Sequence, residues 1–215
     1  MKEGWSIAIG EYNNILLNIK HCNILDYNGE AILCPITETL KAFPISQAIL
    51  KAANIDQLNS IEGLTIGCSR DVPSGDLPHT RIILCVVPEF PEENMSIKAI
   101  QTGLEIANSL GCVSACIPVE KILSTWEASV DILIESFEQY ALCNLSNNLC
   151  MREVTICLNS IEDIKAAIEA SKFRMTRYSS FINIGLPTKD SIPGFYYCYE
   201  CYKMNSVNNK CPHFT

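Results

Sequence analysis

The sequence has no long apolar run: none reaches the ~18 residues that a membrane-spanning helix needs. Positive charge is also scarce, with 16 Lys and Arg against 24 Asp and Glu and a net charge of −8. Such a field does not attract nucleic acid or an anionic membrane. The first residues lack the apolar segment of a signal peptide. We therefore expect a soluble, cytoplasmic protein with neither membrane nor nucleic acid among its partners.

Histidine is rare, with 3 in 215 residues. Hydrolysis through a serine or cysteine nucleophile needs an oriented base, and histidine is the most common one. We interpret His21 and His79 as residues at strand ends, and the sequence assigns no catalytic residue. The polar run from Ser69 to Asp76 matches no phosphate-binding motif, so we interpret it as a turn.

Cysteine is abundant by contrast, with 12 in the chain. Five of them lie inside apolar, strand-like runs, where a thiol packs as a small hydrophobic group: Cys34, Cys85, Cys112, Cys116 and Cys157. Disulfide scaffolds are typically short, loop-rich chains, whereas this chain is 48% hydrophobic and can build a core. We predict that most of the cysteines are reduced core residues.

Short apolar runs predict strands, and apolar stripes with a helical repeat predict the helices between them. The predicted strands are 5–9, 15–19, 30–34, 63–67, 81–87, 113–117 and 154–158. The predicted helices are 45–53, 97–110, 124–143 and a last one over about 160–171, with Ser160 as its N-cap and Asp163 three residues later. This alternation predicts an α/β fold with helices on both faces of a sheet.

The character of the chain changes after Lys172. Hydrophobic periodicity fades, and glycine, proline, asparagine and tyrosine become frequent. From Phe173 onward, five Lys and Arg face two Asp and Glu, so the balance of charge also reverses. We predict an α/β domain over 1–172 and a C-terminal extension over 173–215.

Four segments resemble the macro domain, a fold that binds ADP-ribose and related nucleotide metabolites. They are LLNIKHCNILDYNGEAILCP (16–35), SQAILKAANIDQL (46–58), GLTIGCSRDVPSGDLPHTRIILCVVP (63–88) and SIKAIQTGLEIANSLGCVSACIP (96–118). They look like the family's opening strands, the helix after its glycine-rich loop, its Leu-Pro stretch with the next strand, and the helix and strand before its second phosphate loop. The resemblance implies a three-layer fold over roughly residues 15–171, in which a mixed sheet has helices on both faces.

The resemblance places the ligand-binding positions at Asn23, Pro35, Thr37, Ser46, Val119 and Glu120. The family's residues are absent from several of them. Asn23 stands where the family's aspartate accepts a hydrogen bond from the adenine amino group. The segment from Cys34 to Thr37 replaces Asn-Ala-Ala-Asn, which includes the asparagine associated with the distal ribose. The two glycine-rich loops are replaced by TETLKAFPIS (37–46) and PVEKILS (118–124).

The crossing over 35–44 contains no glycine. Glycine lets a backbone approach a diphosphate with its amides turned toward the oxygens, whereas proline has no amide hydrogen. Glu38 and Glu120 would add carboxylates beside such a ligand, although nearby lysines could offset their charge. Ser46 has two interpretations: its hydroxyl caps the following helix, or the helix N-terminus offers amides to an anion.

The C-terminal extension carries the pattern Cys198-x2-Cys201, followed by Cys211-x-His213. Two thiolates at this spacing can hold one metal ion, and the second pair could complete a tetrahedral structural zinc site. The alternative is a tail with incidental thiols. The aromatic residues of the extension could stack on single-stranded nucleic acid, but we expect them to pack against protein.

Taken together, these patterns favour a divergent macro-domain-like binding or interaction module. It would hold an ADP-ribose-like or other nucleotide-derived ligand, or a protein partner, without efficient hydrolase activity. One alternative is a hydrolase of ADP-ribose or another phosphoester with substituted site residues, of which Asn23, Thr37 and Glu120 are the first candidates. Another alternative is a zinc-tailed adaptor for protein or RNA.

Overall fold

The computed structural model describes residues 6–55, 63–77, 81–144, 149–160, 163, 167, 195–198 and 203–206. Its centre is a seven-stranded mixed sheet with the order β1-β2-β7-β6-β3-β5-β4. The strands are β1 (Ser6–Tyr12), β2 (Ile15–His21), β3 (Ala31–Thr37), β4 (Ser69–Val72), β5 (Arg81–Val87), β6 (Ser114–Pro118) and β7 (Glu153–Leu158). The five inner strands are parallel, and β1 and β4 pair antiparallel at the two edges.

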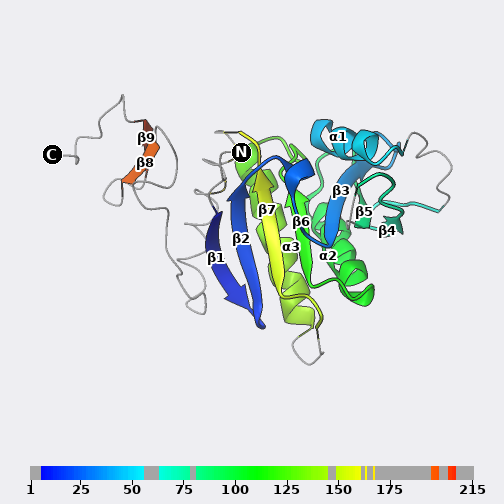
Figure 1. The fold of residues 1–215 in the computed structure, drawn as a ribbon. Helices are drawn as coiled ribbons and strands as arrows, with labels where there is room; N and C mark the ends of the chain where they lie inside the picture. The colour runs from blue at the N-terminus through cyan, green and yellow to red at the C-terminus, as the bar shows by residue number, and fades with distance from the viewer. Residues whose placement is uncertain are drawn as a thin grey trace.

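Helices cover both faces of this sheet. Helix α1 (Pro44–Ala52) packs on one face, while α2 (Glu93–Ser109) and α3 (Trp126–Cys143) lie side by side behind the other (Figure 1). Successive strand residues alternate between the two cores because their side chains point to opposite faces. In β3, Leu33 belongs to the core with α2 and α3, whereas Ile32 and Cys34 belong to the core with α1. The predicted three-layer α/β architecture is confirmed.

The five cysteines predicted to lie in the core are all buried there. Burial raises the pKa of Cys34 and of Cys85 to about 12. Both side chains are therefore protonated at neutral pH and pack as small apolar groups.

The strand predicted over 63–67 is wrong. Gly63 and Gly67 have φ values of 78° and 80°, which lie in the left-handed region and are incompatible with an extended strand. The fourth strand is instead β4, which begins at Ser69. The interpretation of Ser69 to Asp76 as a turn is therefore wrong for its first half, which pairs antiparallel with β5.

The helix boundaries shift by a few residues from those predicted. Helix α2 begins at Glu93 rather than Ile97. Helix α3 begins at Trp126, because Thr125 is its N-cap and accepts a hydrogen bond from the Ala128 amide at 3.1 Å. The apolar stripe marks where a helix touches the core, so the polar first turn of α2 extends beyond its stripe.

In the C-terminal extension, β8 (Phe195–Cys198) and β9 (Lys203–Ser206) pair antiparallel in a two-stranded sheet. The predicted boundary at residue 172 lies outside the described residues, so the division into 1–172 and 173–215 stays a prediction. None of the helices described here is long and apolar enough to cross a membrane.

Candidate functional site

The carboxyl ends of the parallel strands all lie at one end of the sheet, so several connecting loops meet there. We call this end the carboxyl edge of the sheet and the opposite end the amino edge. The chain leaves β3 toward β5 and leaves β6 toward β7, so the switch point of the sheet lies between β3 and β6. Ligands of open α/β sheets bind at such points. The candidate site is therefore formed by the end of β3, the start of α1 and the loop after β6, which hold five of the six predicted ligand-binding residues.

Pro35 and Thr37 belong to β3 itself rather than to the loop that follows it. The strand pairs with β5 along its whole length, but with β6 only at Ala31 and Ile32. Because proline has no amide hydrogen, Pro35 cannot donate to a ladder. Both Pro35 and Thr37 are buried. The protein therefore covers the side chains of both residues.

The loop after β3 folds back on itself. The Thr37 amide donates to the Lys41 carbonyl, and the Leu40 amide donates to the Thr37 carbonyl, both at 2.9 Å. Thr37 Oγ1 accepts a third hydrogen bond from the Lys41 amide at 3.2 Å. Leu40 completes the turn with a φ of 59°, a conformation that glycine would adopt at less cost. The amides of Leu40 and Lys41 in the loop, and that of Thr37 at the end of β3, are thus bound by the protein itself rather than offered to a ligand.

The same loop is held to the segment after β5. Glu38 Oε2 accepts a hydrogen bond from the Glu89 amide at 2.6 Å, and Lys41 Nζ lies 3.4 Å from Glu89 Oε1. The side chains of Lys41 and Glu89 are 71% and 40% exposed. Solvent screens such a pair, which contributes less than about 1 kcal/mol to stability. The Glu38 carboxylate thus binds the backbone of the segment after β5, while Lys41 binds the side chain of Glu89.

Helix α1 begins at Pro44 and has no side-chain cap in its first turn, where Phe43 is the N-cap residue. Proline suits this place because the first amide of a helix has no partner within the helix. Ser46 is the third residue of α1, so the interpretation of its hydroxyl as the N-cap is wrong. The Ser46 amide donates instead to Glu120 Oε1 at 2.6 Å. Ser46 Oγ is buried and has no hydrogen-bond partner within the described part of the chain.

Glu120, in the loop after β6, is only 2% exposed. Its carboxylate meets the first turn of α1, where unpaired amides and the helix dipole favour a negative charge. Burial raises the pKa of Glu120 to about 7; the Ser46 amide counteracts this shift, and the charge of Asp163 adds to it. The chain thus places one of its own carboxylates at the anion-binding end of the helix.

The other amides of this loop are also engaged. The Val119 amide donates to the Cys157 carbonyl of β7 at 3.1 Å, and the Ile122 amide donates to the Glu120 carbonyl at 2.8 Å. The Leu123 amide donates to Ser129 Oγ in α3 at 3.0 Å. Val119 is fully buried. The loop therefore binds the protein's own carbonyl and hydroxyl groups with the amides that a second phosphate loop would present.

Asp163 is a buried acid of this region that the sequence did not assign to the site. Its Oδ2 accepts from the amides of Asn159 and Ser160 at 3.0 and 3.1 Å, and Ser160 Oγ accepts from the Asp163 amide at 3.1 Å. This reciprocal arrangement confirms the predicted N-cap. The spacing of Ser160 and Asp163 indicated their local contact, but the proximity of Asp163 to Glu120 depends on the packing of separate loops.

Asn23 follows β2 and precedes the short 3-10 helix η1 (Ile24–Asp26), which packs against α1. Its side chain is exposed and accepts a hydrogen bond from the Leu25 amide at 3.3 Å, which caps the short 3-10 helix Ile24–Asp26. The structure thus brings Ser46 into contact with Glu120, and places Asn23 in a local structural role.

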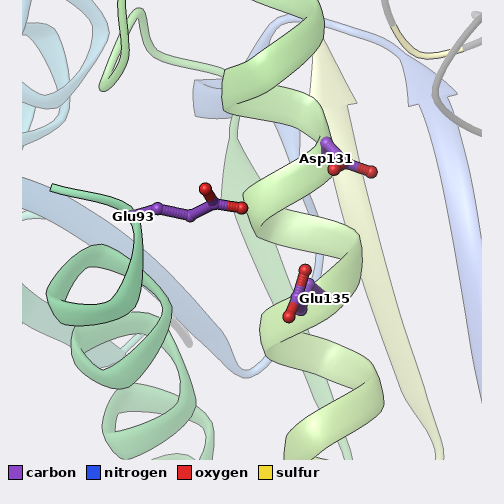
Figure 2. Close-up of side chains that lie close together, drawn as sticks. All are labelled: Glu93, Asp131 and Glu135. Carbon is purple, nitrogen blue, oxygen red and sulfur yellow. The ribbon is translucent and has the colours of Figure 1, made fainter. Parts of the chain in front are cut away.

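A cluster of three carboxylates lies between α2 and α3, away from the predicted site. Glu93 extends from the start of α2 toward Asp131 and Glu135, which lie one turn apart on α3 (Figure 2). Their carboxylate oxygens lie within 4.8 Å of one another. The helical spacing of Asp131 and Glu135 is visible in the sequence, but Glu93 joins them only through helix packing. Clusters of partly exposed acids are common on protein surfaces without a metal ion.

The predicted zinc ligands are mostly outside the described residues. Cys198 is the last residue of β8, and its Cα partner in β9 is Lys203. Cys201, Cys211 and His213 fall on parts of the chain that are not described. The zinc site therefore stays a prediction.

An open cavity of about 700 Å³ lies at the opposite edge of the sheet, at the amino ends of β3 and β5. Its lining includes Glu30, which precedes β3, and Arg81, which begins β5 and lies 3.6 Å from Asp71. The segments around Gly75 and Cys112 form further walls. None of the predicted ligand-binding residues lines this cavity.

No model of a protein family matches the sequence, and no curated protein matches it. Solved structures do match the fold. The macrodomain of Oceanobacillus iheyensis with ADP has a TM-score of 0.67 and 18% identity over 82% of this chain and 100% of that one. The Trypanosoma brucei macrodomain in complex with ADP-ribose has a TM-score of 0.62 and 14% identity over 77% of this chain and 74% of that one. The chain therefore has the macrodomain fold.

Proposed function

We propose that this chain is a binding or interaction module of the macrodomain fold, with an anion site that Glu120 occupies in the absence of ligand. An ADP-ribose-like or other nucleotide-derived ligand would bind weakly, because its diphosphate must displace that carboxylate. The module would lack efficient hydrolase activity. The observation that carries this proposal is the 2.6 Å hydrogen bond from the Ser46 amide to Glu120 Oε1.

An anionic ligand and the Glu120 carboxylate would compete for one helix terminus. The N-terminus of α1 offers only a few unpaired amides, and a buried carboxylate already accepts from one of them. A diphosphate near an ionised Glu120 would also meet like-charge repulsion, about 1–4 kcal/mol at ~4 Å. A pKa of about 7 leaves Glu120 partly ionised at neutral pH, so this repulsion is present under ordinary conditions.

The fold neighbours support the class of ligand. The macrodomain from Oceanobacillus iheyensis has been solved with ADP, and the one from Trypanosoma brucei with ADP-ribose. At under 20% identity they support a shared fold, and the ligand is carried over to this chain as part of the proposal. The fit is weakest where the diphosphate would lie, because the loops there use their amides internally.

The absence of efficient hydrolysis rests on the end of β3. The family's asparagine-containing segment is replaced there by Cys34-Pro35-Ile36-Thr37, and all four residues are buried. Cys34 and Ile36 belong to the apolar core with α1. Such residues offer little to orient a water molecule at a ribose.

Calorimetric titration of the full chain with ADP-ribose tests the proposal. We expect no detectable heat from the wild type at micromolar concentrations, and at least about tenfold tighter binding by Glu120→Gln, which removes the charge and keeps an acceptor for the Ser46 amide. Glu105→Gln, an exposed acid on α2, is the matched control and should behave as the wild type. Tight 1:1 binding by the wild type, or no gain in Glu120→Gln, would overturn the competition.

A second candidate function is a hydrolase, favoured by Glu120 alone. A buried carboxyl with a pKa of about 7 has the acidity that a general acid or base needs at neutral pH. The test is turnover of an ADP-ribosylated protein, followed by joint substitution of Asn23, Thr37 and Glu120. Turnover that survives the triple substitution contradicts this candidate.

A third candidate, the zinc-tailed adaptor, is favoured by the pairing of β8 with β9, because β8 ends at Cys198, the first residue of the Cys198-x2-Cys201 pattern. Zinc analysis of purified protein should find about one ion per chain if the four predicted ligands form one site. Metal-free protein in which the β8–β9 pairing persists contradicts this candidate.

A further inference from the structure

Three thiols gather on neighbouring strands on the α1 face of the sheet. Cys22 follows β2, Cys157 lies in β7, and Cys116 lies in β6. These strands are adjacent, in the order β2-β7-β6. Cys116 and Cys157 belong to the apolar core with α1, and Cys22 packs against that core.

The sulfur atoms of Cys22 and Cys157 lie 2.8 Å apart. A disulfide bond is about 2.05 Å long, so a small movement would bring the two sulfurs to bonding distance. The Cys157 thiol also donates to the Cys22 carbonyl at 3.3 Å, which leaves the Cys22 thiol to donate to the Cys157 sulfur. The side chains are therefore already directed toward each other.

The backbone at Cys22 is bound to β7, but Cys22 itself lies outside the paired strand β2. The Cys22 amide donates to the Leu158 carbonyl of β7 at 3.2 Å, which holds the two segments together. His21 is the last residue of β2, so Cys22 lies beyond the paired strand. A residue outside the ladder can shift by a fraction of an ångström without breaking strand pairing.

The two cysteines differ in access to solvent. Cys22 is half-buried, whereas Cys157 is 2% exposed. A small oxidant can reach Cys22 first, and Cys157 is then the nearby thiol that resolves the product. Cys116 is fully buried on the other side of Cys157, so it is not open to the same attack.

We propose that Cys22 and Cys157 form a reversible disulfide by exchange with a low-molecular-weight disulfide such as glutathione disulfide. In the first step the Cys22 thiolate attacks one sulfur of glutathione disulfide, and the leaving glutathione thiolate takes up a proton. In the second step the Cys157 thiolate attacks the Cys22 sulfur and releases the second glutathione, which is also protonated. Two protein thiols lose two electrons and two protons, and one glutathione disulfide becomes two glutathiones.

The electrostatic surroundings make this exchange slow at neutral pH. The hydrogen bond with Cys157 and burial raise the pKa of Cys22, as does the charge of Asp26, while Lys20 lowers it. The pKa of Cys157 is raised as well, first by its hydrogen bond with Cys116. Because the thiolate is the nucleophile, the rate should increase with pH. This behaviour distinguishes the pair from a fast peroxide sensor.

The bond would connect two segments at the carboxyl edge of the sheet. Cys22 precedes Asn23, which caps the 3-10 helix, and the Cys157 carbonyl accepts from the Val119 amide next to Glu120. The cysteines are 135 positions apart in the sequence. Closing so long a loop restricts the unfolded chain and should raise the melting temperature. This disulfide would form whether or not the protein binds a nucleotide-derived ligand.

Peptide mapping of the full chain after incubation with glutathione disulfide at pH 8 tests the proposal. We expect a crosslinked peptide joining Cys22 to Cys157 and a rise in Tm of about 5 °C that a reducing agent reverses. In Cys157→Ala, Cys22 should be trapped as the mixed disulfide with glutathione. Cys68→Ser, at an exposed free cysteine, is the matched control and should retain the crosslink.

Cys22→Ser should lose both the crosslink and the rise in Tm, and the half-buried position makes this variant the safer one to fold. The proposal is overturned if the wild type yields Cys22 and Cys157 as alkylated thiols. It is equally overturned if Cys22 accumulates as the glutathione mixed disulfide while Cys157 stays reduced.

Discussion

The two edges of the central sheet differ in a way that reverses the usual expectation for an α/β fold. At the carboxyl edge, Thr37, Ser46 and Glu120 are buried, and the loop amides bind protein groups. At the amino edge, an open cavity of about 700 Å³ has exposed Glu30 and Arg81 in its lining. Ligand sites normally lie at the carboxyl edge. Here the protein's own groups occupy the described loop amides of the carboxyl edge.

Glycine placement explains much of this difference. The crossing after β3 has none, so its turn is completed by Leu40 and its amides fold inward. At the amino edge, Gly75 and Gly111 have φ values of 56° and 79°, which other residues rarely adopt. The fold thus determines where a site can form. The backbone freedom of the loops determines whether their amides remain available for a ligand.

The largest expected effect is at Gly75, in the wall of the amino-edge cavity. A Cβ atom there would lie 1.6 Å from the Ala53 carbonyl oxygen, at a φ of 56°. We expect Gly75→Ala to lower the free energy of unfolding by about 4 kcal/mol, through overpacking and left-handed strain. Gly63→Ala shares the left-handed φ but meets no atom within 4 Å, so it should cost only about 1 kcal/mol. Equal effects in urea unfolding would show that backbone strain alone shapes this wall.

The next largest effect is the pH dependence of stability that Glu120 should cause at the carboxyl edge. The folded protein holds the proton of Glu120 with a pKa of about 7, against 4.5 for an ordinary glutamate. Between these values the folded state binds more protons than the unfolded state, so stability should fall as pH rises, by about 3 kcal/mol in total. Glu120→Gln should remove this decline, and Glu105→Gln should keep it, in urea unfolding from pH 4.5 to 8. A decline that persists in Glu120→Gln must come from another group.

A smaller effect is expected at the start of α3, which follows the loop after β6. Thr125 Oγ1 accepts from the Ala128 amide at 3.1 Å, so Thr125→Ala should lower the free energy of unfolding by about 1 kcal/mol. Ser124 is exposed and precedes the cap, so Ser124→Ala should change stability by less than about 0.5 kcal/mol. The reverse order in thermal unfolding would place the N-cap at Ser124 rather than at Thr125.

The smallest effect is expected at the ion pair that holds the first loop. Lys41 and Glu89 are both exposed, at 3.4 Å, so Lys41→Met should lower stability by less than about 0.5 kcal/mol. The change should vanish in 1 M salt, where the Debye length falls to about 3 Å. A loss of stability above 1 kcal/mol would show that the loop after β3 depends on surface charge rather than on its hydrogen bonds.

Much of the fold was predictable because it rests on local patterns. The apolar runs at 81–87 and 154–158 became β5 and β7 almost residue for residue. The stripe in 124–143 became α3. The run at 63–67 failed because hydrophobicity does not report φ, and its two glycines adopt left-handed values. Pro44 likewise starts α1 ahead of the apolar stripe that marked the helix.

The candidate site was predictable only in outline. The absence of glycine from the crossing indicated a poor diphosphate site, and Glu120 was identified as an acid beside it. The sequence could not show that Glu120 binds the Ser46 amide, because 74 positions separate the two residues. Nor could it show the approach of Asp163, the third carboxylate at Glu93, or the contact of Cys22 with Cys157.

By itself, then, the sequence determined the layers of the fold, the buried cysteines and the lack of backbone freedom at the carboxyl edge. These follow from side-chain polarity and residue type, which act over a few neighbouring positions. Only the tertiary structure decided which group fills the helix N-terminus and which thiols meet. Those contacts depend on strand order and loop packing, which bring together residues that are distant in the chain.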